Sequence, residues 1–255
     1  MDNHRIPATP PIAEVGPSHP YLPYRFVDRG YMVITYESEP AAIRAVVPAP
    51  LVPDPSNRVS YEWIRTPRPS GFGDDTQSSL VIPCTFNGRP CDFVTQTYVD
   101  DDPLFVAGRG TGGFAWKHAR PSLAISRRTL IGTLDYAGQR VAMGTVAYKQ
   151  ALYAGGWSNL EASLRKPRCL LKTISDIDGG PAIAQLVGVE LTDVTVKGSW
   201  SGPAQLDLVP HVDVPVTDLP VRRVIGGRHF VADLTLPAGH VLVDYLEDRD
   251  LRLAA

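Results

Sequence analysis

The sequence predicts a β-rich fold of the α+β class, and three observations support this prediction. Short segments rich in β-branched and apolar residues recur along the 255 residues, and few segments show a helical apolar period. Twenty-four prolines and twenty-two glycines separate these segments, as expected for short strands joined by turns. The hydrophobic content of 44% is enough for a sizeable core. Pattern alone therefore predicts a barrel or sandwich with two or three peripheral helices.

The predicted strands follow one another through most of the chain. In chain order they are 31–36, 81–86, 130–136, 140–149, 182–191, 194–200 and 230–236. The dipeptide Ala137-Gly138 between the third and fourth of these segments is typical of a hairpin turn.

Two short helices are expected between the strands. The first is predicted over 39–47, with Ser38 as its N-cap and Pro40 in its first turn. The second is indicated by Ser158 and Glu161, which have the spacing of a capping box.

Charge and hydropathy exclude two classes of partner. The net charge is −2, the isoelectric point is near 6.3, and the basic residues are scattered, so nucleic acid is not expected to bind. No apolar run approaches the roughly 18–20 residues that a membrane span needs, so no membrane association is expected. A small molecule is the expected partner.

The chain is predicted to contain a Pro-rich N-terminal arm, residues 1–19, and one domain, residues 20–255. The arm lacks the apolar core of a secretory signal peptide. An arm with no apolar pattern of its own gains most by docking on another surface, so we expect it to lie across a neighbouring subunit of a homo-oligomer.

Cysteine and histidine spacing predict neither disulfides nor a metal site. Cys84, Cys91 and Cys169 form a sparse set without C-x-x-C spacing, which is typical of reduced thiols in a cytoplasmic protein. The six histidines show no H-x-x-H or H-E-x-x-H pattern. We expect no metal and no cofactor.

Glycines concentrate in the stretch TYVDDDPLFVAGRGTGGFAWKHARP, residues 97–121. Such a cluster marks positive φ, a bulge, or backbone that lies close to another group. Three of these glycines match the G-x-G-x-x-G dinucleotide fingerprint, but Pro121 and the β-branched segment after it exclude the helix that the fingerprint needs. The match is interpreted as chance, and the stretch as a surface hairpin or a pocket wall beside Trp116.

Within this stretch, GRGTGGFAWKHARP resembles the segment G-R-E-x-x-G-[FY]-P-K-K-x-A-x-P of the acetoacetate decarboxylase family. Other stretches are similar to the same family: YRFVDRGYMVITY from Tyr24, YEWIRTP from Tyr61, GFGDDTQSSLVIP from Gly71 and YVDDDP from Tyr98. The likeness covers roughly residues 20–247. It implies a closed, cone-shaped antiparallel β-barrel whose interior holds the active site.

The resemblance implies a chemistry that this sequence retains only in part. The family's decarboxylases form a Schiff base between a lysine and the carbonyl of a 3-oxo acid, which requires a desolvated, neutral amine. In this chain Trp116 occupies the position of that lysine, and Lys117 occupies the position of the family's second lysine. Successive side chains of a strand face opposite sides, so Lys117 is expected to point away from the cavity unless a bulge intervenes.

The acidic positions of the family are also partly changed. Glu62 and Arg29 match a carboxylate and an arginine of the family's site, whereas Gln77 replaces a second carboxylate and cannot move a proton at neutral pH. We expect Arg29 to bind an anion, Glu62 to act as general acid or base, and Gln77 to orient the substrate. An alternative interpretation makes Glu62 and Arg29 a mutual buried ion pair that only stabilises the fold.

The remaining residues expected in the substrate site are Trp116, Phe114, Thr97 and His118. The indole of Trp116 would form a flat apolar wall suited to a substrate larger or flatter than acetoacetate. The sequence thus favours a lyase without a Schiff base that acts on an oxo acid or a β-oxygenated carbonyl compound, by hydration or dehydration, retro-aldol cleavage or cyclisation. Two alternatives stay open: a 3-oxo acid decarboxylase that uses the displaced Lys117, and a barrel that only binds a small molecule.

Overall fold

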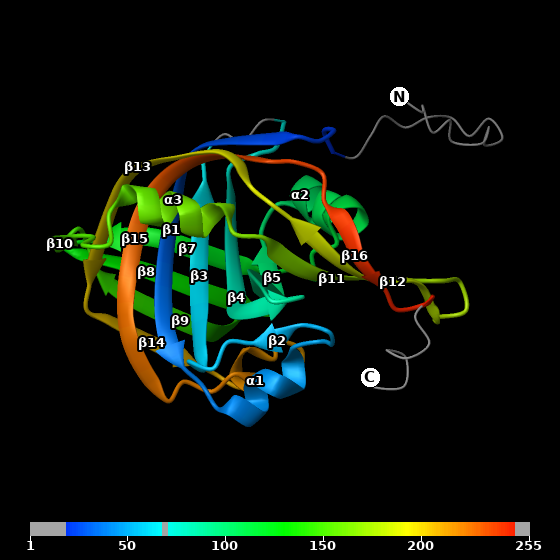
Figure 1. Cartoon of the computed structure of the whole chain (residues 1–255). Helices are drawn as coiled ribbons and strands as arrows, with labels where there is room; N and C mark the ends of the chain where they lie inside the picture. The colour runs from blue at the N-terminus through cyan, green and yellow to red at the C-terminus, as the bar shows by residue number, and fades with distance from the viewer. Residues whose placement is uncertain (1–18, 68–70, 248–255) are drawn as a thin grey trace.

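Figure 1 shows the computed structural model of the chain, which describes residues 19–67 and 71–247. The expected arm lies outside the described residues except for its last residue. The strands are β1 (Tyr24–Glu37), β2 (Val52–Pro53), β3 (Arg58–Thr66), β4 (Asp75–Phe86), β5 (Arg89–Val99), β6 (Trp116–His118), β7 (Arg120–Ser126), β8 (Thr129–Tyr136), β9 (Gln139–Ala147), β10 (Ala151–Leu152), β11 (Arg168–Ser175), β12 (Pro181–Val189), β13 (Thr192–Gly202), β14 (Ala204–Leu208), β15 (Arg223–Leu236) and β16 (His240–Asp244). The helical elements are α1 (Pro40–Val46), α2 (Asp102–Ala107), the π-helical turn η1 (Gly108–Gly112), α3 (Trp157–Arg165) and the 3₁₀ turn η2 (Val216–Asp218).

Most strands belong to one large sheet in the order β10-β13-β15-β1-β3-β4-β5-β11-β12-β16, with β2 and β6 attached to β4 and β5. A smaller sheet has the order β14-β9-β8-β7 and includes the expected β8–β9 hairpin. Pairing is antiparallel except where β5 meets β6 and β11. The β-rich class is therefore confirmed. The closed barrel is not, because β10 and β16, the ends of the large sheet, do not pair with each other in the part of the chain that is described.

The core between the two sheets is built around Trp63 on β3. Its indole is fully buried, and Nε1 donates to the backbone oxygen of Thr133 on β8 at 3.0 Å. A Cβ on Gly132 or Gly144, which are paired across β8 and β9, would stand 2.4 or 2.6 Å from this indole. Glycine at these two positions therefore allows the smaller sheet to close onto the larger one.

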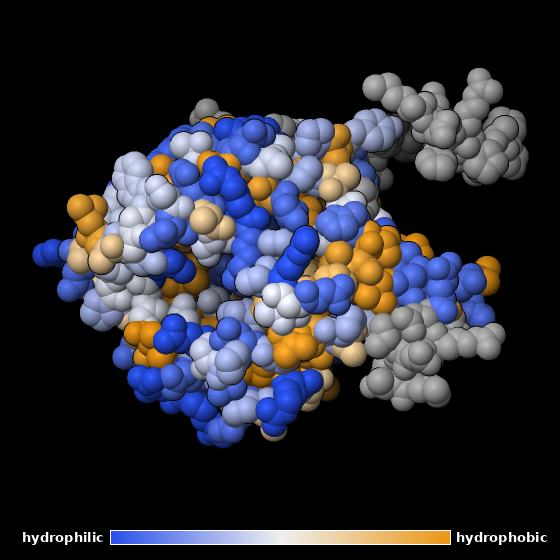
Figure 2. All heavy atoms as spheres, viewed as in Figure 1, coloured by the Kyte–Doolittle hydropathy of each residue, from blue (hydrophilic) through white to orange (hydrophobic). Residues whose placement is uncertain are grey.

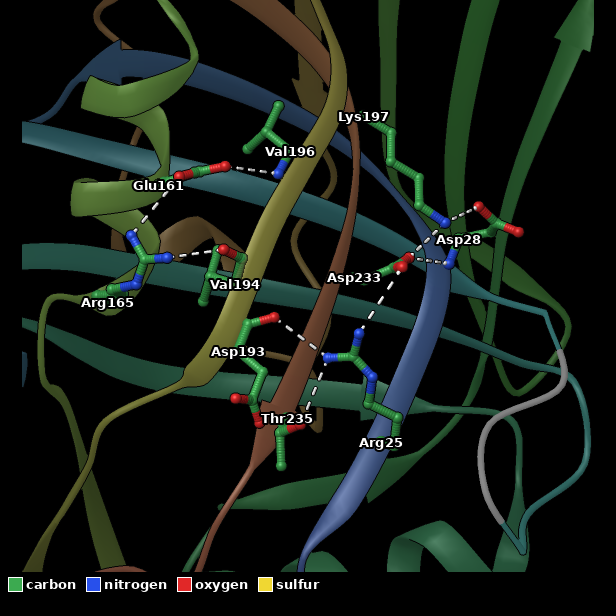
Figure 3. Close-up of polar contacts among 10 residues, drawn as sticks. All are labelled: Arg25, Asp28, Glu161, Arg165, Asp193, Val194, Val196, Lys197, Asp233 and Thr235. Atoms are coloured by element: carbon green, nitrogen blue, oxygen red, sulfur yellow. Dashed lines mark hydrogen bonds and ion pairs between the residues drawn. The ribbon is translucent and has the colours of Figure 1, made fainter.

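Helix α3 covers a second core on the other face of the large sheet. It crosses β13, β15 and β1 (Figure 1) and buries Leu160 and Leu164. The expected capping box is wrong, because Ser158 is the second residue of the helix. The carboxylate of Glu161 instead accepts a hydrogen bond from the backbone N–H of Val196 at 2.9 Å (Figure 3).

Helices α1 and α2 differ in how well the sequence predicts them. α1 confirms the first expected helix, but Glu39 rather than Ser38 is its N-cap residue. The sequence did not predict α2, because this helix has only six residues and lies between a run of three acids and a glycine-rich stretch. Its N-cap is Asp101, whose carboxylate accepts from the N–H of Leu104 at 2.7 Å.

Strand β1 contains a β-bulge that changes which residues face the second core. Val27 and Asp28 of β1 together stand opposite Asp233 of β15, and Asp28 has a positive φ of 55°. Phe26 before the bulge and Arg29 after it are both buried on the same face, although they are three positions apart along the chain. Regular alternation through these four residues, without a bulge, would turn Arg29 to the opposite face.

Asp233 holds this bulge in place (Figure 3). Its carboxylate accepts from the backbone N–H of Asp28 at 2.8 Å and from Nζ of Lys197 at 2.7 Å. Lys197 also contacts the carboxylate of Asp28 at 2.6 Å, and it is itself the additional residue of a bulge on β13. The cluster therefore ties β1, β15 and β13 together at the point where Arg29 is turned inward.

Candidate active site

A cavity of about 60 Å³ lies between the large sheet and the segment formed by α2, η1 and β6. Most of its wall is aliphatic or aromatic. The polar residues in the wall, aromatic residues aside, are Arg29, Gln77, Ser79, Thr97 and Arg168. A mostly apolar cavity with a few convergent polar groups is typical of a small-molecule site. The small volume favours a compact substrate.

Trp116 forms the wall of the cavity on the β6 side. It pairs in parallel register with Thr97 of β5, is only 4% exposed, and its ring lies 5.0 Å from that of Phe114. A Cβ on Gly108 would stand 2.3 Å from the indole, so a glycine is needed where η1 passes over it. Within the described residues, the buried Nε1 of Trp116 has no hydrogen-bond partner. The glycine-rich stretch is therefore a pocket wall rather than a surface hairpin.

Lys117 and His118 lie outside the cavity. Nζ of Lys117 donates to the backbone oxygen of Asp213, and the exposed His118 contacts Asp102 at 3.3 Å. The alternation of β6 therefore turns Trp116 inward and Lys117 outward, as expected. The assignments of Lys117 as a displaced nucleophile and of His118 as a substrate-binding residue are corrected, because neither side chain reaches the cavity.

Arg29 is a buried cation in the cavity wall. It is 8% exposed, its Nε donates to Oγ1 of Thr66 at 3.2 Å, and its guanidinium lies 4.5 Å from the ring centre of Phe26. No described carboxylate lies within 4 Å of its nitrogens, although the buried Asp75 is near enough to interact with its charge. A buried guanidinium that no carboxylate contacts directly can bind an anion, here a carboxylate that enters the cavity.

Glu62 is paired with an arginine that the sequence patterns missed. Arg168, the first residue of β11, donates to the Glu62 carboxylate through Nη1 at 3.2 Å and Nη2 at 3.4 Å. Burial lowers the pKa of Arg168, but Glu62, Tyr31 and Asp92 together raise it by more, so the guanidinium stays charged. The alternative of a mutual pair between Glu62 and Arg29 is therefore wrong. Glu62 borders the cavity only through Arg168.

Asp75 is a buried acid that sequence reasoning also missed. It is 2% exposed, and its Oδ1 accepts a hydrogen bond from Nε2 of Gln77 at 2.8 Å. Burial raises the pKa of Asp75 to about 6, although Arg29, Gln77 and Thr66 each lower it. One signal could have found it: the acid absent at position 77 is present at position 75, two residues along the same face of a strand.

The described residues contain neither a cluster of metal ligands nor a membrane-spanning helix. Throughout residues 19–67 and 71–247, no three His, Cys, Asp or Glu side chains are grouped so that they could hold a metal ion. None of the helices in those ranges is both long and apolar enough to cross a membrane. Cys84, Cys91 and Cys169 are buried and free.

The fold and the cavity together define a β-rich protein with a site for a small molecule. Residues 9–246 match the family model described as "Acetoacetate decarboxylase (ADC)". The chain is 47% identical over 231 residues to an acetoacetate decarboxylase of Chromobacterium violaceum, which covers 90% of this chain and 92% of that protein. It therefore belongs to the acetoacetate decarboxylase family and is a lyase of that superfamily.

Solved structures give the same result. The crystal structure of acetoacetate decarboxylase from Legionella pneumophila matches with a TM-score of 0.89 and 36% identity, over 95% of this chain and 94% of that one. The enduracididine biosynthesis enzyme MppR matches with a TM-score of 0.77 over 89% of this chain and 90% of its own. At 18% identity, this second likeness concerns the fold alone.

Proposed function

We propose that the protein is a lyase that acts on a small oxo acid or β-oxygenated carbonyl compound by acid/base chemistry, without a Schiff base. One observation carries the proposal: all five lysines lie among the described residues, and none of them lines the cavity. An imine requires an amine that reaches the substrate carbonyl. Where the family's lysine would stand, the cavity presents the indole of Trp116.

Each polar group in or beside the cavity has a proposed role. Arg29 binds the substrate carboxylate, and Gln77 orients the oxygen at the third carbon. Glu62 is the proposed general base for the proton next to the carbonyl; because its carboxylate lies behind Arg168, a bound substrate must displace that guanidinium to reach it. Loss of that proton together with the hydroxyl of a 3-hydroxy acid is a dehydration, which is the simplest of the reactions that these groups support.

Two assays test the proposal. Incubation with acetoacetate and borohydride should leave every lysine peptide unmodified in mass spectrometry, because no amine reaches the cavity. Incubation with 3-hydroxybutyrate should produce the ultraviolet absorbance of its unsaturated product, and Glu62→Asp, which retains the charge opposite Arg168, should lower kcat more than it changes KM. A reduced lysine adduct with release of carbon dioxide would establish the decarboxylase instead. Binding without any turnover would favour the barrel that only binds a small molecule.

We also propose that the protein is a homo-oligomer. β16 is an outer strand of the large sheet, and it carries the exposed Val241. Apolar surface gathers on the side of the molecule where β16 and β12 lie (Figure 2), and Ile177 is fully exposed in the loop between β11 and β12. An open edge with apolar neighbours is a surface for pairing with a second copy. Light scattering at micromolar concentration that gives a monomer would contradict this.

A further inference from the structure

The environment of Asp75 determines what Gln77 presents to a substrate. Asp75 and Gln77 lie two residues apart on one face of β4, and Gln77 is part of the cavity wall. The charged and polar groups around Asp75 come from each neighbouring element: Arg29 from β1, Thr66 from β3 and Asp100 from the end of β5. The second oxygen of Asp75, Oδ2, is buried and accepts no hydrogen bond from the described residues.

An ionised carboxylate can only accept hydrogen bonds. The Gln77 side chain must therefore turn its NH₂ group toward Asp75, as the 2.8 Å contact between Nε2 and Oδ1 shows. This orientation follows from the chemistry of the pair and does not depend on distinguishing the nitrogen and oxygen of the amide. The carbonyl oxygen Oε1 of Gln77 is then left for the cavity, and no described group donates to it.

We propose that Asp75 is a positioning residue that makes Gln77 a hydrogen-bond acceptor toward the cavity, and that the site accordingly prefers a small 3-hydroxy carboxylic acid to the corresponding 3-oxo acid. The inference rests on the proposed binding of the substrate carboxylate by Arg29. With that group fixed, the hydroxyl at the third carbon donates to Gln77. A ketone oxygen in the same place would put two acceptors against each other and leave both unpaired, which disfavours the oxo acid by about tenfold.

The preference depends on pH in a defined direction. Above pH 6 Asp75 is ionised and holds Gln77 in the acceptor orientation. Below pH 6 the protonated Asp75 can donate to Oε1 of Gln77, which allows the amide to turn and present its NH₂ group to the cavity. The hydroxy acid then loses its advantage over the oxo acid. A guanidinium group does not deprotonate in proteins, so carboxylate binding itself is retained.

Calorimetric titration with two matched probes, 3-hydroxybutyrate and freshly prepared acetoacetate, tests the inference well above and well below pH 6. The wild-type protein should bind the hydroxy acid about tenfold more tightly above pH 6, and this ratio should fall toward one below it. In Asp75→Asn the neighbouring amide can both donate and accept, so the ratio should be small and independent of pH. Gln77→Leu should bind both acids with similar affinity.

Asp100→Asn is the matched control. Asp100 is also an acid at this end of the sheet, but its Oδ1 accepts from the backbone N–H of Thr76 at 2.7 Å and does not contact Gln77. This variant should keep the wild-type ratio at both pH values. Circular dichroism checks that each variant is folded.

Three results would overturn the inference: a wild-type ratio that does not change with pH, equal or tighter binding of acetoacetate above pH 6, or no binding of either acid. The proposed function is decided separately by turnover. A pH-dependent preference without dehydration would uphold the role of Asp75 and reject the proposed reaction. Dehydration by a protein that shows no such preference would uphold the proposed reaction and reject the role of Asp75.

Discussion

Replacement of Asp75 by asparagine should make the protein more stable at neutral pH. The carboxyl group has an ordinary pKa of 3.8, and burial raises that pKa to about 6 in the folded state. The folded protein therefore binds more protons than the unfolded chain between these two values, and the free energy of unfolding falls as pH rises from about 4 to about 6. The shift of roughly two pKa units corresponds to about 3 kcal/mol, which is an upper estimate of what Asp75→Asn restores.

The assay is urea unfolding of the wild-type protein and of Asp75→Asn across this pH range. Subtracting the two free energies of unfolding cancels the contributions of the other titrating groups. The two free energies should be similar near pH 4, and the variant should become the more stable one as pH rises past 6. Asp233→Asn is a control of opposite sign: burial raises the pKa of Asp233, but Lys197, the backbone N–H of Asp28 and Arg25 together lower it by more, so this variant should be destabilised at neutral pH. An Asp75→Asn variant that is less stable at neutral pH, or a difference that is independent of pH, would refute the reasoning.

Three further outcomes follow from the cavity. Trp116→Lys combined with Gln77→Glu restores an amine and an acid at the family's positions. We expect borohydride to trap acetoacetate at residue 116, which peptide mass spectrometry detects. No adduct there would contradict the placement of Trp116. Arg168→Met leaves Glu62 buried without its partner and should lower the free energy of unfolding by about 3–5 kcal/mol, much of which Glu62→Gln in the same chain should recover. Gly108→Ala places a Cβ 2.3 Å from the indole and should cost about 1–3 kcal/mol in urea unfolding, whereas the same change at Gly110, where a Cβ meets no atom within 4 Å, should cost less.

The structure could be predicted from the sequence where it depends on residues that are neighbours along the chain. The hairpin of β8 and β9 follows from two β-branched segments around Ala137-Gly138. The inward direction of Trp116 and the outward direction of Lys117 follow from strand alternation alone. The family motifs placed Arg29 and Gln77 in one site, and the structure brings both of them to the cavity wall.

The role of a residue could not be predicted from the sequence where that role depends on partners far away along the chain. Glu62 and Arg168 are 106 residues apart, and nothing near Arg168 distinguishes it from an ordinary basic residue after a helix. Ser158 and Glu161 have the spacing of a capping box, but Glu161 bonds to the backbone of β13, which no local pattern reveals. Three of the groups that act on the pKa of Asp75, Arg29, Thr66 and Asp100, likewise lie outside its own strand.

The bulge in β1 makes the direction of Arg29 depend on backbone conformation as well as on residue type. Regular alternation through the four residues from Phe26 to Arg29 would turn either Arg29 out of the cavity or Phe26 toward solvent, so this chain needs the bulge to keep both side chains on one face. Deleting Val27 or Asp28 would remove the bulge and leave a regular strand, in which Phe26 and Arg29 are two positions apart and still share a face. A relative with one residue fewer before its arginine could therefore keep the anion site without a bulge. Comparisons within the family should allow for a gap of one residue between Phe26 and Arg29 before they transfer a role.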